Sequence, residues 1–164
     1  MDEHFSEGGI GFMDMKKIYN IILVGKTRRT SNQIDEVAKY LKRTLKSLEH
    51  SDYRLMRMLV EKLHVAEFKT NEVVLDEGEE DNVQLIVLEG SVSKIRDRRV
   101  LSTFVQNQSV GEDVTIEQRG PRKLRNFYVK ANTPAKVMLL SRNGFSTTKG
   151  MYDLDRERLC HRLL

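Results

Sequence analysis

The sequence predicts an α+β fold, in which an N-terminal helical section is followed by an antiparallel unit of short strands and one short C-terminal helix. Two observations carry this prediction. Between residues 30 and 63, apolar side chains recur at three- and four-residue steps, as on the buried face of a helix. Between residues 68 and 140, short β-rich runs alternate with glycine and asparagine turns, which is typical of a sandwich or barrel. Helices that pack on such a unit make an α+β domain.

The first 29 residues are expected to form a partly disordered N-terminal extension. They begin with the acidic, glycine-rich run MDEHFSEGG, which lacks the basic start of a signal peptide. The apolar run IYNIILVG follows, and at this length periodicity does not separate a helix from a strand. The run is also too short to span a bilayer, so no membrane span is predicted.

Two helices are predicted before the strands. Thr30 or Ser31 is a suitable N-cap for the first helix. Its apolar stripe consists of Ile34, Val37, Leu41, Leu45 and Leu48. The hydroxyl of Ser51 is a suitable cap for the second helix. The inner face of that helix consists of Leu55, Met58, Leu59 and Leu63.

Short strands are predicted after these helices, and their main runs are 83–88, 91–95, 100–105, 127–131 and 135–140. The acidic run DEGEEDN at 76–82 lacks the alternating oxygen ligands of a calcium loop and is interpreted as a turn. The charged run RDRR at 96–99 is interpreted as a hairpin tip. The tail at 153–164 combines charges with leucines and predicts a short helix.

The composition indicates a non-catalytic, cytoplasmic domain. The chain has 164 residues and a formal net charge of +4, with acidic residues between its lysines and arginines, which does not favour a nucleic-acid partner. Its one cysteine, Cys160, excludes an internal disulfide and indicates a reduced environment. The four histidines are scattered, and no nucleotide loop or nucleophile elbow is present. We therefore expect no enzyme, no metal and no cofactor.

Several motifs occur in a fixed order between Phe68 and Phe145. The pattern F-x-x-G-E-x-I-x-x-E-G-D-x-x-D-x-x-Y-x-I-x-x-G-x-V can be laid on the chain from Phe68 without a gap, and V-x-A and L-x-R-x-x-F follow at 129–131 and 140–145. Asn71 replaces a turn glycine, a position where asparagine tolerates a positive φ. The matching positions of the first pattern are Glu72, Val74, Glu77, Gly78, Val87, Gly90 and Val92.

In these motifs residues 30–150 resemble the cyclic nucleotide-binding domain family. The resemblance implies an antiparallel, jelly-roll-like β-roll of eight strands that binds cAMP or cGMP; which of the two stays open. In the family, a short helix and the loop before it hold the cyclic phosphate, because a helix N-terminus offers free N–H groups and an arginine pairs with the phosphate. The family pattern at this site is G-E-x-A, followed by P-R.

The resemblance places the ligand site at residues 111–125. Gly111 and Glu112 match the family's glycine and glutamate, and Glu112 is implied to accept a hydrogen bond from the ribose hydroxyl. Asp113 and Val114 stand in place of the x-A pair. A carboxylate at Asp113 weakens phosphate binding if it faces the ligand, and caps the short helix if it faces outward.

The phosphate arginine has two candidates. Arg122 follows a proline, as in the family's P-R pair, whereas the spacing back from the V-x-A motif selects Arg125. If Arg125 holds the phosphate, Tyr128 stands where the family has threonine or serine, and its ring would intrude on the pocket. Either choice requires an insertion relative to the family.

The resemblance also implies how the domain would act. Phe145 matches the apolar residue at the family's hinge, and residues 151–164 are expected to form a short, truncated hinge or lid helix. A ligand would order the site and move that helix, which relays the signal to a protein effector such as a kinase, an exchange factor or a channel. The alternative is a degenerate member that keeps the fold as a ligand-free protein-interaction scaffold.

Overall fold

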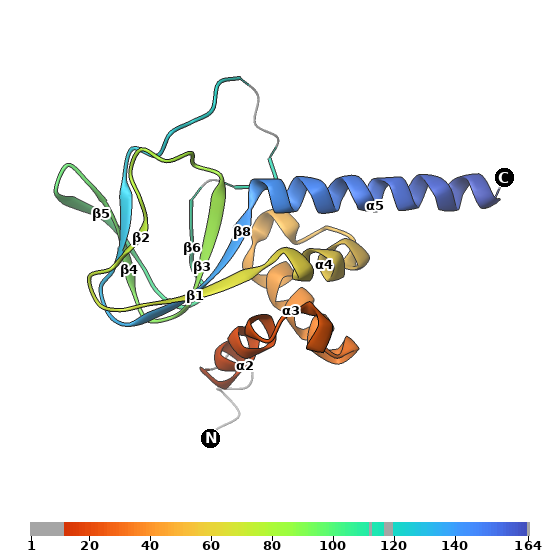
Figure 1. Cartoon of the computed structure of the whole chain (residues 1–164), viewed down its shortest axis with the longest axis horizontal. Coiled ribbons are helices and arrows are strands. Elements are labelled where there is room, and N and C mark those ends of the chain that lie inside the picture. The colour runs from red at the N-terminus through yellow and green to blue at the C-terminus, as the bar shows by residue number, and fades with distance from the viewer. Residues whose placement is uncertain (1–11, 112, 117–119, 164) are drawn as a thin grey trace.

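The helices of this chain gather on one side of its strands (Figure 1). The structure is a computed structural model, and it describes residues 12–111, 113–116 and 120–163. Helices α2 (Phe12–Leu23), α3 (Ser31–Thr44) and α4 (Tyr53–Leu59) precede the strands, and α5 (Arg142–Leu163) follows them. Short 3-10 helices lie at 26–28, 46–48 and 60–62.

The described strands form two open antiparallel sheets of four strands each. One sheet has the order β1-β8-β3-β6, and the other has the order β2-β7-β4-β5. The strands are β1 (His64–Phe68), β2 (Val73–Leu75), β3 (Val83–Glu89), β4 (Val92–Arg96), β5 (Arg99–Phe104), β6 (Ser109–Val110), β7 (Tyr128–Ala131) and β8 (Ala135–Ser141). The predicted α+β fold with an antiparallel eight-stranded β-roll is thereby confirmed.

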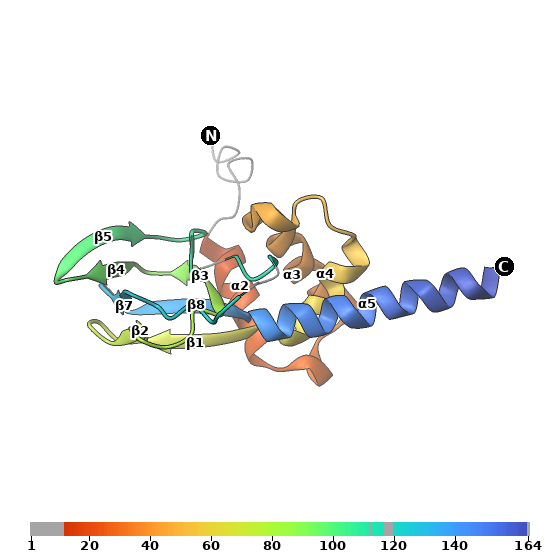
Figure 2. The same ribbon diagram turned by 90° about the horizontal axis from the view of Figure 1, so that it is seen from above.

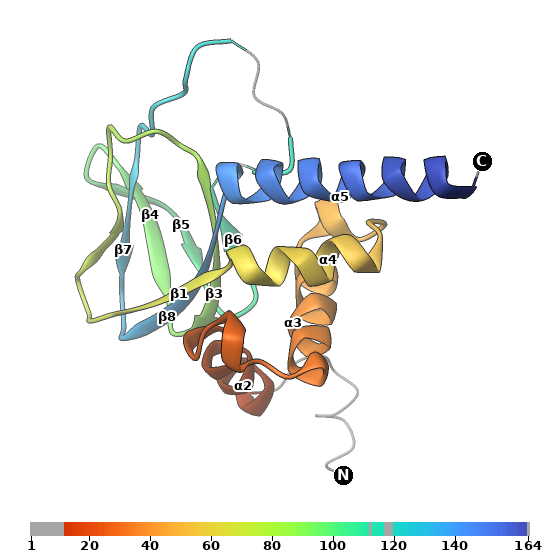
Figure 3. The ribbon, with the colours of Figure 1, turned by 45° about the vertical axis from the view of Figure 1, so that its right-hand side comes forward.

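Strand β3 separates two layers of the core. Ile86 and Leu88 pack with the helices, whereas Leu85 and Val87 pack between the sheets. This division follows from the strand itself, because successive side chains point to opposite faces. Figure 3 shows the same arrangement, with α2, α3 and α4 beside β1, β3 and β8, and with β4 and β7 farther away.

Two turns of the roll require left-handed backbone. Asn71 has φ 71°, which confirms that asparagine can replace the glycine expected there. At the tip between β4 and β5, Asp97 and Arg98 have φ 52° and 64°. Two successive positive φ values are typical of the type I′ turn, which matches the twist of a two-residue hairpin. The charged run at 96–99 is therefore a hairpin tip, as predicted.

The apolar run near the N-terminus is part of a helix, α2. Its side chains Ile18 and Ile22 are each 4% exposed and belong to the same core cluster as α3 and α4. Arg29 donates hydrogen bonds to the carbonyls of Ile21 and Ile22 near the end of α2, and to that of Val60. These bonds add a donor to carbonyls at helix ends, where the regular helical hydrogen bonds run out. The expected disorder of the first residues falls mostly on residues 1–11, which lie outside the described residues.

The helix starts follow capping rules, with one correction. Thr30 caps α3 as predicted, since its hydroxyl accepts from the Gln33 amide and the Gln33 side chain accepts from the Thr30 amide. The second helix, α4, is capped by Asp52 rather than Ser51: Asp52 Oδ1 accepts from the Arg54 amide at 2.8 Å. Serine and aspartate are similar N-caps, so only the backbone path decides between neighbours.

The last helix begins earlier than expected. A short helix over 151–164 was predicted, whereas α5 starts at Arg142 and has 22 residues. At its start, Ser141 Oγ accepts from the Gly144 amide at 2.9 Å. Phe145 and Tyr152 are buried against the other helices, and this packing outweighs the low helix propensity of glycine in this first part.

The far half of α5 extends beyond the other helices (Figure 2). Apolar side chains there are more than half exposed, namely Met151, Leu154 and Leu159. Only the beginning of α5, which contains the expected hinge residue Phe145, is therefore built into the core. None of the described helices has the length and apolar content that a bilayer crossing requires.

Candidate ligand-binding site

A cavity of about 390 Å³ opens at the end of the β-roll, beside the loop where a ligand site was expected. Its lining comes from three parts of the chain: the β2–β3 turn, strand β4, and the long connection between β6 and β7. The lining residues are Asp81, Lys94, Gly111, Asp113, Lys123, Leu124, Arg125, Asn126 and Phe127. The lining therefore contains the three cations Lys94, Lys123 and Arg125 and the two carboxylates of Asp81 and Asp113.

Gly111 is required by the backbone at this edge of the cavity. Its φ is 104°, and a Cβ at this position would lie 2.5 Å from the carbonyl oxygen of Val83. A side chain would therefore clash with β3 in addition to the strain of positive φ. The glycine lets the loop after β6 approach β3 closely. Glu112, the next expected site residue, lies outside the described residues.

Asp113 and Val114 hold the following loop in place. Asp113 Oδ1 accepts from the amide and the hydroxyl of Thr115, at 2.9 and 2.5 Å. Val114 is 1% exposed and packs in the helical core rather than into the cavity. Residues 113–116 form a turn, so the short helix that the family has here is not present in this described stretch. Asp113 therefore lines the cavity and also fixes its own turn.

Arg125 is the candidate arginine that lies at the cavity. Its side chain is 2% exposed, and its Nε lies 3.5 Å from Asp81 Oδ1. Nη1 donates to the Asp76 carbonyl at 2.6 Å, and Nη2 donates to the Glu80 carbonyl at 3.3 Å. The β2–β3 turn therefore surrounds the guanidinium, as a buried charge requires. Nη1 and Nη2 therefore have hydrogen-bond partners in the turn, whereas Nε and Asp81 Oδ1 lie at ion-pair distance without a hydrogen bond among the described residues.

Arg122, the other candidate, does not line the cavity. Its side chain is 82% exposed, and Nη1 lies 3.6 Å from Glu80 Oε2. An exposed pair of this kind contributes little to stability. Of the two candidate arginines, the structure therefore places Arg125 at the cavity and Arg122 outside it, a choice that the sequence spacing left open.

Tyr128 does not enter the cavity, contrary to the expectation for its ring. Phe127 and Val129 are buried between the sheets, whereas Tyr128 is half-buried and absent from the lining. Alternation along β7 gives the reason, because neighbouring side chains point to opposite faces. The ring of Phe127 instead lies beneath Lys94, whose Nζ is 4.1 Å from its centroid.

Four lining residues outside the expected 111–125 were missed at the sequence level: Asp81, Lys94, Asn126 and Phe127. Asn126 and Phe127 directly follow Arg125 in the β6–β7 connection, whereas only the packing of the roll brings Asp81 and Lys94 to it. The sequence offered one indication of these residues, the acidic run at 76–82 that contains Asp81, and this run was interpreted as a turn without a role in the site. Among the described residues no group of three potential metal ligands comes together.

The solved structures most informative for this chain are cyclic nucleotide-binding domains. The C-linker/CNBHD of zELK channels aligns with a TM-score of 0.61 and 18% identity over 84% of this chain and 70% of that one. The regulatory domain of Toxoplasma gondii PKA with cAMP aligns with a TM-score of 0.59 and 20% identity, over 80% of this chain. This chain spans about half, 51%, of that regulatory domain.

A cyclic nucleotide-binding-like protein from Brucella abortus aligns with a TM-score of 0.58 and 17% identity, over 71% of this chain and 99% of that one. No family model matches the sequence, and no curated protein matches it either. At such low identity, these likenesses show the fold of cyclic nucleotide-binding domains.

Proposed function

We propose that this chain, which has the fold of cyclic nucleotide-binding domains, is a non-catalytic regulatory module of the cytoplasm whose cavity at the end of the roll receives a cyclic nucleotide. The observation that carries the proposal is the position of Arg125 at this cavity, held by Asp81. An arginine fixed in this way is oriented before the ligand arrives, which lowers the entropic cost of binding.

The cavity suits an anion of this size. Its volume of about 390 Å³ lies within the range of small-molecule sites. Lys94, Lys123 and Arg125 outnumber the carboxylates of Asp81 and Asp113 by one charge. The exposed side chain of Leu124, on the lining, offers an apolar surface for a base. One of the similar solved structures, from Toxoplasma gondii, contains cAMP.

A short path links this cavity to the last helix. Asp81 holds Arg125, and the neighbouring Asn82 accepts a hydrogen bond through its carbonyl from the Arg142 amide at 2.7 Å. Arg142 is the first residue of α5. A ligand that binds Arg125 and moves the turn around it therefore changes the support of α5, and it shifts the helix if the two helix positions differ in ligand affinity. A protein effector would read the position of α5.

The second candidate function is a ligand-free interaction scaffold. It is favoured by the enclosure of Arg125, whose Nη1 and Nη2 already donate to carbonyls of the β2–β3 turn. The carboxylate of Asp113 on the cavity wall also opposes a phosphate. In a scaffold of this kind, the buried pair of Arg125 and Asp81 stabilises the fold, and partner proteins bind to the outer surface of the domain.

Isothermal titration of the folded chain with cAMP and with cGMP distinguishes the two functions. We expect binding to one of them, and Lys94→Ala to weaken it about thirtyfold, since a charge-assisted contact contributes about 2 kcal/mol. Arg122→Ala is the matched control, because this exposed arginine lies off the lining. Absence of heat at millimolar ligand would reject the sensor and leave the scaffold.

A further inference from the structure

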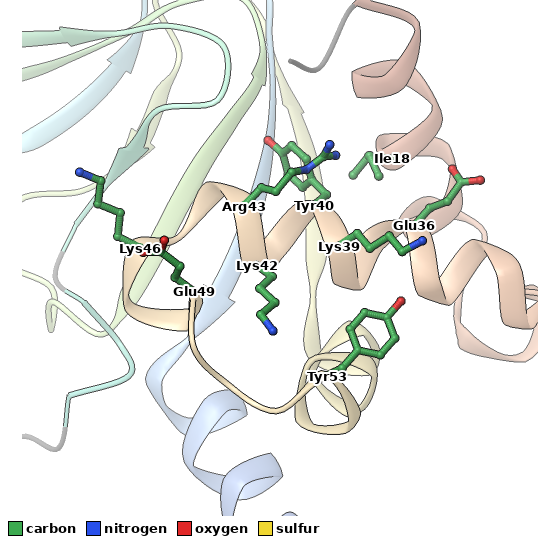
Figure 4. A pocket seen from close by; sticks show the side chains of 9 residues that line it. All are labelled: Ile18, Glu36, Lys39, Tyr40, Lys42, Arg43, Lys46, Glu49 and Tyr53. Carbon is green, nitrogen blue, oxygen red and sulfur yellow. The ribbon is translucent and has the colours of Figure 1, made fainter. Parts of the chain in front are cut away.

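A second and larger cavity, of about 820 Å³, lies among α2, α3 and α4, away from the end of the roll. Four of its lining residues are cations of α3 and the turn after it, Lys39, Lys42, Arg43 and Lys46, and two are tyrosines, Tyr40 and Tyr53. We call this the basic groove. Figure 4 shows Lys39 and Lys42 reaching from α3 toward the side where Tyr53 lies, with Arg43 beside Tyr40.

Three of the four cations lie on one face of α3. Lys42 and Arg43 follow Lys39 by three and four residues, a spacing that places side chains on the same helix face, and Lys46 follows in the 3-10 turn after α3. Within the described residues, none of the four takes part in an ion pair. The groove also contains Glu36, but this carboxylate already pairs with Lys17 at 2.9 Å. The remaining acid on the lining is Glu49. The groove therefore has an unbalanced positive charge.

The floor of the groove is the edge of the helical core. Ile18 is 4% exposed and Tyr40 is fully buried, so the ring that a ligand can contact is that of the half-buried Tyr53. The Tyr40 hydroxyl donates to Asn107 Oδ1 at 3.0 Å, so its polar end is satisfied inside the protein. Burial raises the pKa of Tyr40 to about 12, which keeps the phenol neutral. Tyr53 forms a half-buried wall, and its hydroxyl donates to the Asp35 carbonyl at 3.2 Å.

We propose that the basic groove is a docking site for a short acidic peptide segment of a partner protein, with carboxylates on the cations and an apolar side chain against the half-buried ring of Tyr53. Charge complementarity across an interface accelerates association and selects the partner. A membrane surface is too flat to reach the floor of a cavity. A nucleic acid would bring its phosphates against Glu49, whereas a peptide offers backbone N–H groups to this carboxylate.

Fluorescence polarisation of a labelled peptide tests this proposal. The probe carries four glutamates around one phenylalanine, and the comparison probe has glutamines in place of the glutamates. We expect the full chain to bind the acidic probe and not the glutamine probe. The variant with Lys39→Glu and Lys42→Glu should weaken binding at least tenfold, because both cations lie on the lining.

The matched control carries Arg96→Glu and Arg99→Glu. These exposed residues lie opposite each other on β4 and β5, and the change in net charge is the same. Circular dichroism checks that both variants fold. Equal loss of binding in the two variants would show attraction to net charge alone and overturn the proposal.

Two further results would also overturn it. One is groove-dependent binding of phosphatidylserine vesicles without binding of the peptide. The other is a concentration-dependent dimer in sedimentation that the groove variant abolishes, because a second copy would then occupy the groove.

Discussion

The hydroxyl of Tyr152 in α5 donates a hydrogen bond of 2.6 Å to Oδ2 of Asp52, the residue that caps α4. One carboxylate therefore performs two tasks, since its other oxygen accepts from the Arg54 amide. The bond joins residues 100 positions apart in the sequence. It fixes the buried part of α5 against the helical layer, and it makes α5 the element whose attachment can be tested most directly.

Tyr152→Phe should weaken the attachment of α5 to α4 and make the melting temperature less dependent on pH in the acidic range. The Tyr152 hydroxyl, and next the Arg54 amide, lower the pKa of Asp52 below its ordinary value. A lowered carboxyl pKa stabilises the fold above the ordinary pKa of about 4, and this contribution is lost as the pH falls through the lowered value. Thermal melts should therefore show wild type above the variant at neutral pH, with the two converging in acid.

Tyr128→Phe is the control for this experiment, because Tyr128 lies on β7 and, among the described residues, its hydroxyl forms no hydrogen bond with α5. It should melt like wild type at every pH. A constant difference between wild type and Tyr152→Phe from neutral to acid pH would contradict the role of Asp52.

Breaking the buried pair of Arg125 and Asp81 should destabilise the roll strongly. Both side chains are at most 5% exposed, so either single change to alanine leaves an unpaired buried charge, which costs about 3–5 kcal/mol. Urea unfolding measures the loss. Arg122→Ala, which breaks only an exposed contact with Glu80, should change stability by less than about 0.5 kcal/mol. Similar effects of the two arginines would refute the assignment.

Two glycine substitutions should act in opposite directions. Gly111→Ala introduces a Cβ 2.5 Å from the Val83 carbonyl oxygen at φ 104°, and it should lower the melting temperature. Gly150→Ala meets no atom within 4 Å in the interior of α5, and it should add up to about 1 kcal/mol of stability. A neutral Gly111→Ala would show that the loop does not approach β3 so closely.

The connection between the cavity and α5 depends on one backbone N–H group, that of Arg142. Proline fits the first residue of a helix but has no N–H, so Arg142→Pro should remove the bond to the Asn82 carbonyl while α5 persists. Hydrogen exchange should then become faster in the first turns of α5. Arg142→Ala keeps the amide and serves as control. If hydrogen exchange in the first turns of α5 becomes equally fast in both variants, the side chain of Arg142 rather than its amide connects α5 to the cavity.

The fold was predictable because its signals are local. The three- and four-residue steps of α3, the alternation along β3 and the turn residues Asn71, Asp97 and Arg98 each depend on neighbours in the sequence. The start of α5 was not predictable from the sequence. Gly144 and Gly150 weaken the helical pattern there, and only the burial of Phe145 and Tyr152 compensates for this weakness.

The sequence by itself determined the α+β class, the order of helices and strands, and two candidate arginines. Only the tertiary structure decided that Arg125 lies buried at the cavity with Asp81 while Arg122 is exposed. The physical reason is that a buried guanidinium needs partners for its N–H groups. The carbonyls of Asp76 and Glu80 that supply them lie more than 40 positions away in the sequence, and only the closure of the roll brings them together.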